Sequence, residues 1–198
     1  MRGKRYRIFL SVLTLVLILL ALAAESVYFS DFEYRYRTKM FNKTLAEKET
    51  ILEDCLNDMK PILASENHHG SITENKLFSI AEKNRISILE YVDNKLWYWS
   101  DNEFDVPVSF IDSLYNRPLV FFQNGWFLTK TVQARNEKII GLLRLHTDYG
   151  FENNNIKSGF EKEYRMPDNI EFSIEKEASE FHVLNKEGDF LFSLIFPK

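Results

Sequence analysis

An uninterrupted apolar run over residues 8–24 constrains this chain more than any other feature, because water is a poor solvent for such a segment. The run reads IFLSVLTLVLILLALAA and contains 17 residues without a charge, of which only Ser11 and Thr14 are polar. A helix that spans a membrane needs roughly 17 to 25 predominantly apolar residues. The sequence therefore predicts either a transmembrane helix at the short end of that range or the apolar core of a secretory signal peptide.

The charges on either side of the run predict its orientation. Four basic residues and no acidic ones precede residue 25, namely Arg2, Lys4, Arg5 and Arg7. Acidic residues follow the run at positions 25, 31 and 33. Because lysine and arginine stay on the cytoplasmic side of a membrane, we expect residues 1–7 to form a basic cytoplasmic leader. The chain after residue 24 is then expected on the opposite side.

Retention and cleavage of this segment both stay open at this point. Ala21, Leu22 and Ala23 resemble the small-residue pattern at which signal peptides are cleaved. Cleavage after Ala23 would release an exported soluble ligand-binding protein, whereas retention would give a single-pass membrane protein. We favour retention, because the helix predicted immediately after the run would join the anchor to the rest of the chain.

Length and charge limit what the remainder does. A chain of 198 residues supports one domain, or one domain plus an appendage. Residues 25–198 carry 21 basic and 29 acidic side chains, a net charge of −8. Such a surface repels phosphates, so nucleic acid is not an expected partner.

Residues 25–66 are expected to form one long helix, because glycine and proline are absent from residues 25–60. Its apolar stripe follows helical spacing and consists of Phe41, Leu45, Leu52, Cys55, Leu56, Met59, Ile62 and Leu63. A helix of this length rises on the order of 50 Å, more than a small sheet needs as cover. We therefore expect its membrane-proximal half to pack on a second copy in a homodimer, with the stripe residues Phe41, Leu45 and Leu52 in the seam. The alternative is a single amphipathic helix that lies on its own domain.

The lone cysteine, Cys55, stands on the same stripe, so no internal disulfide can form. We expect it to be a small buried apolar side chain rather than a redox group. A second, shorter helix is expected over residues 74–83, where Leu77, Ile80 and Ala81 share one face.

From Ile86 onward the apolar pattern alternates, which predicts strands. A hairpin is expected around Asp93 and Asn94, and a second tight turn at Asn124 and Gly125. The expected strands cover residues 86–92, 95–99, 119–123, 126–134, 138–146, 170–175, 181–184 and 190–196, with a helical turn near residues 110–115. The fold class is thus α+β, with a central antiparallel sheet of about five strands.

Aromatic side chains concentrate in the strands and are the candidate binding residues. Because strand side chains alternate, Trp97 and Trp99 are expected on one face of their hairpin and Leu96 and Tyr98 on the other, with both faces covered. These aromatic side chains belong either to the core or to a ligand pocket. The ligand-binding candidates are Trp97, Trp99, Phe121 and Trp126.

No pattern in the sequence predicts a catalytic or metal site. The seven glycines form no phosphate-binding loop, and no G-x-S-x-G nucleophile elbow is present. The four histidines, at positions 68, 69, 146 and 182, have no cysteine or acidic residue at metal-ligand spacing beside them. We therefore predict no catalytic residue, no metal and no cofactor; an exported enzyme would need a polar cleft with acids of perturbed pKa.

The order of elements, and three stretches in particular, resemble a known family. The order is membrane helix, long helix, hairpin, loop and three-stranded meander, and the stretches are ISILEYVDNKLWYWSDN, GLLRLHTDYGFENNNIKSGF and FHVLNKEGDFLFSL. Together they resemble the PAS-like or Cache-like extracytoplasmic input region of bacterial membrane-bound sensor histidine kinases, over most of the chain. These motifs are structural rather than catalytic.

The resemblance implies a function in two-component signal transduction. It places residues 67–198 in the periplasm as a sensor domain, with residues 1–66 in and beside the inner membrane. It also implies a homodimer that passes ligand-induced helix shifts across the membrane, with a small-molecule or periplasmic ligand. The kinase module of that family, with its phosphorylated histidine and ATP-binding domain, has no counterpart in these residues, so only sensing and transmission are expected of them.

Overall fold

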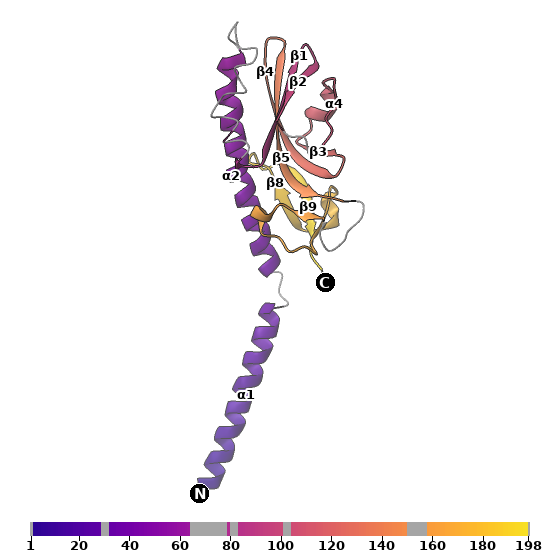
Figure 1. Ribbon diagram of the computed structural model, residues 1–198. Helices are drawn as coiled ribbons and strands as arrows, with labels where there is room; N and C mark the ends of the chain where they lie inside the picture. Colours follow the sequence, from indigo (N-terminus) through magenta and orange to yellow (C-terminus); the bar gives the residue numbers. More distant parts are fainter. Residues whose placement is uncertain are drawn as a thin grey trace. The chain divides into compact units, whose positions relative to one another are not determined.

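The computed structural model of the chain describes residues 2–28, 32–63, 79, 83–100, 104–149 and 158–197 (Figure 1). The chain divides into two compact units, residues 1–37 and residues 38–198, which are described in turn. The helix expected over residues 74–83 lies almost wholly outside the described residues.

Helix α1, Arg2–Tyr28, contains the whole apolar run. Its large apolar side chains from Phe9 to Leu22 are between 45% and 63% exposed. Among the described parts of the chain, no helix combines the length and the apolarity needed to cross a membrane. The expected helix over residues 25–66 is found as α2, Phe32–Leu63, while residues 25–28 belong to α1. The expected unbroken passage between the two falls on residues 29–31, outside the described residues.

Helix α2 buries its apolar stripe against its own domain. Glu33 in the first turn and Lys60 in the last complement the helix dipole, and Pro61 stands only in the final turn. The buried side chains are at most 3% exposed: Phe41, Leu45, Leu52, Cys55, Leu56 and Met59. The seam expected at Phe41, Leu45 and Leu52 is therefore wrong, because the strands that follow in the chain already cover this stripe. The alternative of an amphipathic helix on its own domain is confirmed, and so is the buried Cys55.

The larger sheet is antiparallel and confirms the α+β fold class. Its strands are β1 (Ile86–Val92), β2 (Lys95–Trp99), β3 (Leu119–Phe122), β4 (Gly125–Ala134) and β5 (Glu137–Thr147). They lie in the order β2-β1-β5-β4-β3, and the short β6 (Gly159–Phe160) pairs with the end of β5. The compact unit that holds this sheet begins at Thr38, so α2 from Thr38 onward belongs to the same unit.

Turn chemistry explains two of the hairpins. Asp93 and Asn94 have φ values of 50° and 63°, the left-handed pair that a two-residue hairpin turn needs, as expected. The next turn consists of Gln123 and Asn124, with Gln123 at φ 47°, and not of Asn124 and Gly125. Gly125 begins β4 instead, where a Cβ would lie 2.5 Å from the Phe127 ring. Close packing rather than the turn requires this glycine.

The two faces of the larger sheet have different covers. On one face, α2 packs on side chains that include Ile88, Leu128 and Leu143. The helix packs tightly on Gly141 of β5, where a Cβ would overlap Leu52 Cδ1. On the other face lie α4 (Asp112–Tyr115), which confirms the expected helical turn, and residues 104–110.

A second, three-stranded sheet extends the surface that α2 covers. Its strands are β7 (Glu171–Ser173), β8 (Phe181–Leu184) and β9 (Phe190–Ile195), in the order β7-β9-β8, and two short 3-10 helices, η2 (Lys162–Tyr164) and η3 (Lys176–Ala178), flank them. The Phe41 ring of α2 stacks on Tyr164 at 4.3 Å and meets Phe192 edge-on at 5.8 Å. Asn42 binds the backbone of β8 twice, donating to His182 O at 3.0 Å and accepting from Leu184 N at 2.9 Å. Helix α2 thus joins both sheets.

Candidate functional site

Two of the four aromatic candidates lie on β2, an edge strand of the larger sheet. Trp97 is 61% exposed and Trp99 is 45% exposed, whereas Leu96 and Tyr98 are half-buried. The expectation that both faces of this hairpin are covered is therefore wrong. The physical reason is that residues 104–110 cover only the face on which Leu96 packs.

The other two candidates lie at the opposite edge of the sheet. Phe121 of β3 and Trp126 of β4 pair across the strands with ring centroids 5.0 Å apart, and Trp126 also meets Phe172 of β7 at 5.2 Å. The strand order β2-β1-β5-β4-β3 separates this pair from Trp97 and Trp99, so the structure does not bring the four together. Ligand binding by either pair stays a prediction.

A polar cleft of about 370 Å³ opens beside β4. Regular pairing between β3 and β4 ends at Leu119 and Leu128, because Pro118, which precedes β3, has no N–H to donate. The connection from α4 runs beside β4 from there, with Thr129 N donating to Pro118 O at 2.9 Å and Thr131 Oγ1 donating to Tyr115 O at 3.4 Å. The cleft is lined by Glu49, Tyr115, Asn116, Arg117, Pro118, Leu128, Thr129, Lys130, Thr131, Asn185 and Asp189. Four parts of the fold therefore meet at it: α2, the α4–β3 connection, β4 and the β8–β9 turn.

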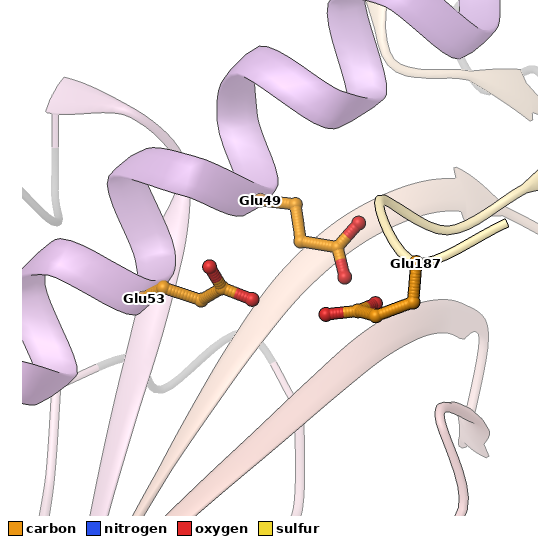
Figure 2. Close-up of side chains that lie close together, drawn as sticks. All are labelled: Glu49, Glu53 and Glu187. Carbon is orange, nitrogen blue, oxygen red and sulfur yellow. The ribbon is translucent and has the colours of Figure 1, made fainter.

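A lysine held by three carboxylates forms one wall of the cleft. The Nζ of Lys130 lies 2.9 Å from Glu49 Oε1, 3.1 Å from Glu53 Oε1 and 3.1 Å from Glu187 Oε1. Figure 2 shows these carboxylates pointing toward one another, two from α2 and one from the β8–β9 turn. Their oxygens lie within 4.8 Å of one another, a spacing that would suit a metal ion. The ammonium of Lys130 occupies that position and offers three donors to three acceptors.

A second lysine closes the cluster from the β8–β9 turn. Lys186 Nζ lies 2.6 Å from Glu53 Oε2, and the backbone N–H of Lys186 donates to Glu49 Oε2 at 2.8 Å. Three carboxylates and two ammonium groups leave the cluster with a net charge of −1. Both Lys130 and Glu53 are held in their charged forms. Burial alone would lower the pKa of Lys130 and raise that of Glu53, but the opposite charges outweigh burial and shift each pKa the other way.

Glu49 is the member of the cluster that depends most on its partners. Its side chain is 0% exposed, and its Oε1 makes no hydrogen bond, although the ionic contact to Lys130 is 2.9 Å long. A buried carboxylate is tolerated only when it is paired. Lys130 and the Lys186 N–H are therefore the contacts that compensate the burial of Glu49.

His146, at the end of β5, is buried among rings. Its side chain is 8% exposed and meets Phe160 and Phe172 with centroids 4.8 Å and 4.9 Å away, and its Nδ1 makes no hydrogen bond. Burial lowers the pKa of His146 to about 4, against the smaller opposing effect of Asp148. It is therefore a neutral side chain of the core near neutral pH.

The charged cluster was missed at the sequence level, although a signal for it exists. Glu49 stands four residues after Leu45 and three before Leu52, a position where the helical stripe calls for an apolar side chain. Lys130 likewise stands between Leu128 and Val132 on the inward side of β4. Two opposite charges at inward-facing positions of a helix and a strand indicate a buried pair, although their pairing is not encoded locally.

Comparison with known proteins identifies no relative. No family model matches the chain, and neither the curated proteins nor the solved structures contain a significant match.

Proposed function

We propose that this chain is the extracytoplasmic sensor region of a two-component sensor histidine kinase of the PAS-like or Cache-like kind, and that its ligand binds in the cleft beside β4. The observation that carries the proposal is the meeting of α2 and both sheets at the cleft, through Glu49, Lys130 and the β8–β9 turn. An occupant of the cleft touches every layer of the unit. The kinase activity itself would lie outside these residues.

The topology supports the proposal. A long helix, a hairpin, a loop and a three-stranded meander follow one another, the order of elements on which the resemblance rests, and the strands form one antiparallel sheet in the order β2-β1-β5-β4-β3. Fold alone does not define function, so the site has to carry the argument. The cleft is lined by side chains of both signs, Lys130 and Arg117 together with Glu49 and Asp189, which suits a small polar molecule better than an apolar one.

The apolar run supports attachment to a bacterial inner membrane, with residues 67–198 as a sensor domain in the periplasm. Its large apolar side chains are exposed around the helix, and a surface of that kind is covered by lipid or protein rather than by water. The alternative function is an exported soluble ligand-binding protein, released by cleavage after Ala23. The N-terminal mass of the mature protein separates the two, because an intact leader in the membrane fraction excludes the cleaved form.

The proposed homodimer uses the outward face of α2, since the apolar stripe is already buried. Lys39, Lys43 and Glu47 are exposed on this face at four-residue spacing. Single cysteines there, in a Cys55→Ser background, should crosslink between subunits in membranes, whereas a cysteine at the buried Leu45 should not. Equal crosslinking at all four positions would reject the dimer.

The sensor function is tested by joining residues 1–198 to the kinase module of a characterised sensor and measuring phosphorylation in response to a panel of amino acids, dicarboxylates and amines. An active compound should also raise the melting temperature of the full chain in detergent. Asn116→Trp, which fills the cleft from an exposed position, should abolish both responses, and Glu177→Trp, at an exposed position of η3 that does not line the cleft, should leave them intact. Responses that survive Asn116→Trp would exclude the cleft.

A further inference from the structure

We infer that Lys130 is the joint through which the cleft controls how firmly α2 is held to the two sheets. The inference rests on the proposed function for the identity of the trigger, which is a ligand in the cleft. The joint itself is a property of the described contacts and can be tested without any ligand.

The geometry makes one ammonium group common to three parts of the fold. Lys130 belongs to β4 of the larger sheet, Glu49 and Glu53 belong to α2, and Glu187 belongs to the turn of the second sheet. The Lys130 side chain is 27% exposed and lines the cleft together with Glu49. An occupant of the cleft therefore meets the same ammonium that holds α2.

Lys130 lies beside a close packing contact between α2 and the sheet. It pairs across the sheet with Gly141 of β5, where Leu52 of α2 packs so tightly that there is no space for a Cβ. The ionic contact and this packing contact are therefore neighbours, so movement of the Lys130 side chain acts on α2 where the helix packs tightly on the sheet.

Electrostatics makes the loss of Lys130 costly. Once Lys130 leaves, three carboxylates lie with their oxygens within 4.8 Å of one another and only Lys186, on Glu53, offsets their charge, so the remaining like charges repel. Glu49 would also lose the counterion of a fully buried carboxylate, which is strongly destabilising. The relief available is for α2 to lift and let water reach Glu49 and Glu53, so loss of Lys130 releases the helix.

The chain contains its own reporter of this movement. Cys55 is the only cysteine, lies two residues after Glu53 on α2, and is 3% exposed. A thiol reagent modifies it only when the helix opens. The rate of labelling at fixed pH therefore measures how often α2 lifts from the sheets.

The experiment compares labelling of Cys55 in the full chain, in detergent, for Lys130→Met and for Lys162→Met. Lys162 is the control, because it is an exposed lysine of η2 that lies neither on the proposed dimer face nor in the cleft. We expect labelling to be roughly tenfold faster or more in Lys130→Met and within about twofold of wild type in Lys162→Met. Lys130→Arg, which keeps the charge, should restore most of the protection.

A second thiol separates lifting of α2 from general loosening. Leu142→Cys in a Cys55→Ser background places a thiol on the opposite face of the sheet, where residue 142 is 0% exposed. Lys130→Met should leave labelling at position 142 unchanged. Unchanged labelling of Cys55, or equal acceleration at both positions, would overturn the inference.

A milder variant keeps the test available if Lys130→Met fails to fold. Glu187 is 48% exposed, and Glu187→Gln removes only the contact from the second sheet. It should accelerate Cys55 labelling by roughly threefold, less than the loss of all three contacts, and no acceleration would count against the joint. A chain whose labelling follows these expectations but which responds to no ligand would keep the joint and lose the proposed sensor function.

Discussion

The two faces of the larger sheet are covered in different ways. The face toward α4 is closed by rings and by a pair of hydroxyls, with Tyr91 OH 2.8 Å from Tyr115 OH and donating to Pro107 O at 2.7 Å. The face toward α2 also has an apolar core, but it includes a buried carboxylate, a caged lysine and a glycine under the helix. Aromatic packing does not depend on salt or pH, whereas buried charge does. The comparison indicates that the α2 side is the adjustable side of the unit.

The largest expected effect concerns the aromatic face of the larger sheet, which is the face toward α4. Phe127 is 1% exposed and packs between Phe104 and Phe122. Phe127→Ala should lower the free energy of unfolding by about 3 to 5 kcal/mol, because it removes a buried ring and leaves a cavity. Denaturant titrations at low and high salt should give the same loss. A loss that changes with salt would break the comparison between the two faces.

The next largest effect is the dependence of stability on pH that His146 causes. His146 belongs to the α2 side, because its neighbour Phe160 meets Phe41 of α2 at 5.2 Å. Its folded-state pKa of about 4 lies below the ordinary 6.5, so the unfolded chain binds more protons between these values. Stability should fall as pH drops from about 6.5 to about 4, by on the order of 2 to 3 kcal/mol in total, with no further contribution below that. Melting curves of His146→Phe over this range should lack that part of the decline. An unchanged decline would assign it to other groups.

A smaller loss of stability is expected from disturbing the close packing between α2 and the sheet. Gly141→Ala should cost about 1 to 3 kcal/mol, because the added methyl group would lie 2.2 Å from Leu52 Cδ1 unless the helix shifts. Gly159→Ala is the matched control, since a Cβ there would meet nothing within 4 Å. Denaturant midpoints measure both. Equal losses of stability in the two variants would show that α2 is not tightly packed on Gly141.

The smallest expected effect concerns a hydroxyl without a partner on the α2 side. Tyr164 is 3% exposed, stacks on Phe41, and its OH makes no hydrogen bond. Tyr164→Phe should leave stability unchanged or raise it by up to about 1 kcal/mol, because a buried unsatisfied polar group is removed. Tyr91→Phe, which loses two hydrogen bonds on the other face, should instead destabilise the fold. Thermal melts of the two variants should therefore shift in different directions.

The sequence predicted the strands well because their signals are local. Alternation over residues 86–92 and 119–147, with left-handed turn residues such as Asp93 and Asn94, is enough to define hairpins and a meander. Which element packs on the apolar stripe of α2 could not be predicted in the same way. A helical stripe such as Phe41, Leu45 and Leu52 states that one side is buried, but not whether a sheet or a second helix buries it.

The candidate site was out of reach for a related reason. Glu49, Lys130 and Glu187 are far apart in the chain, and only the fold brings them together. The only sequence signal for the cluster is that these charges stand in otherwise apolar patterns. Two tryptophans in one short strand are a stronger signal, but they lie exposed on the edge strand β2.

The two bonds from Asn42 to β8 have a consequence for solubility. The outer edge of a sheet offers unpaired backbone groups on which a foreign strand can grow. Here one amide side chain, presented by a helix, occupies the carbonyl of His182 and the N–H of Leu184 as a neighbouring strand would. If α2 lifts, that protection is lost together with the helix, so a unit that opens too readily would expose a template for aggregation.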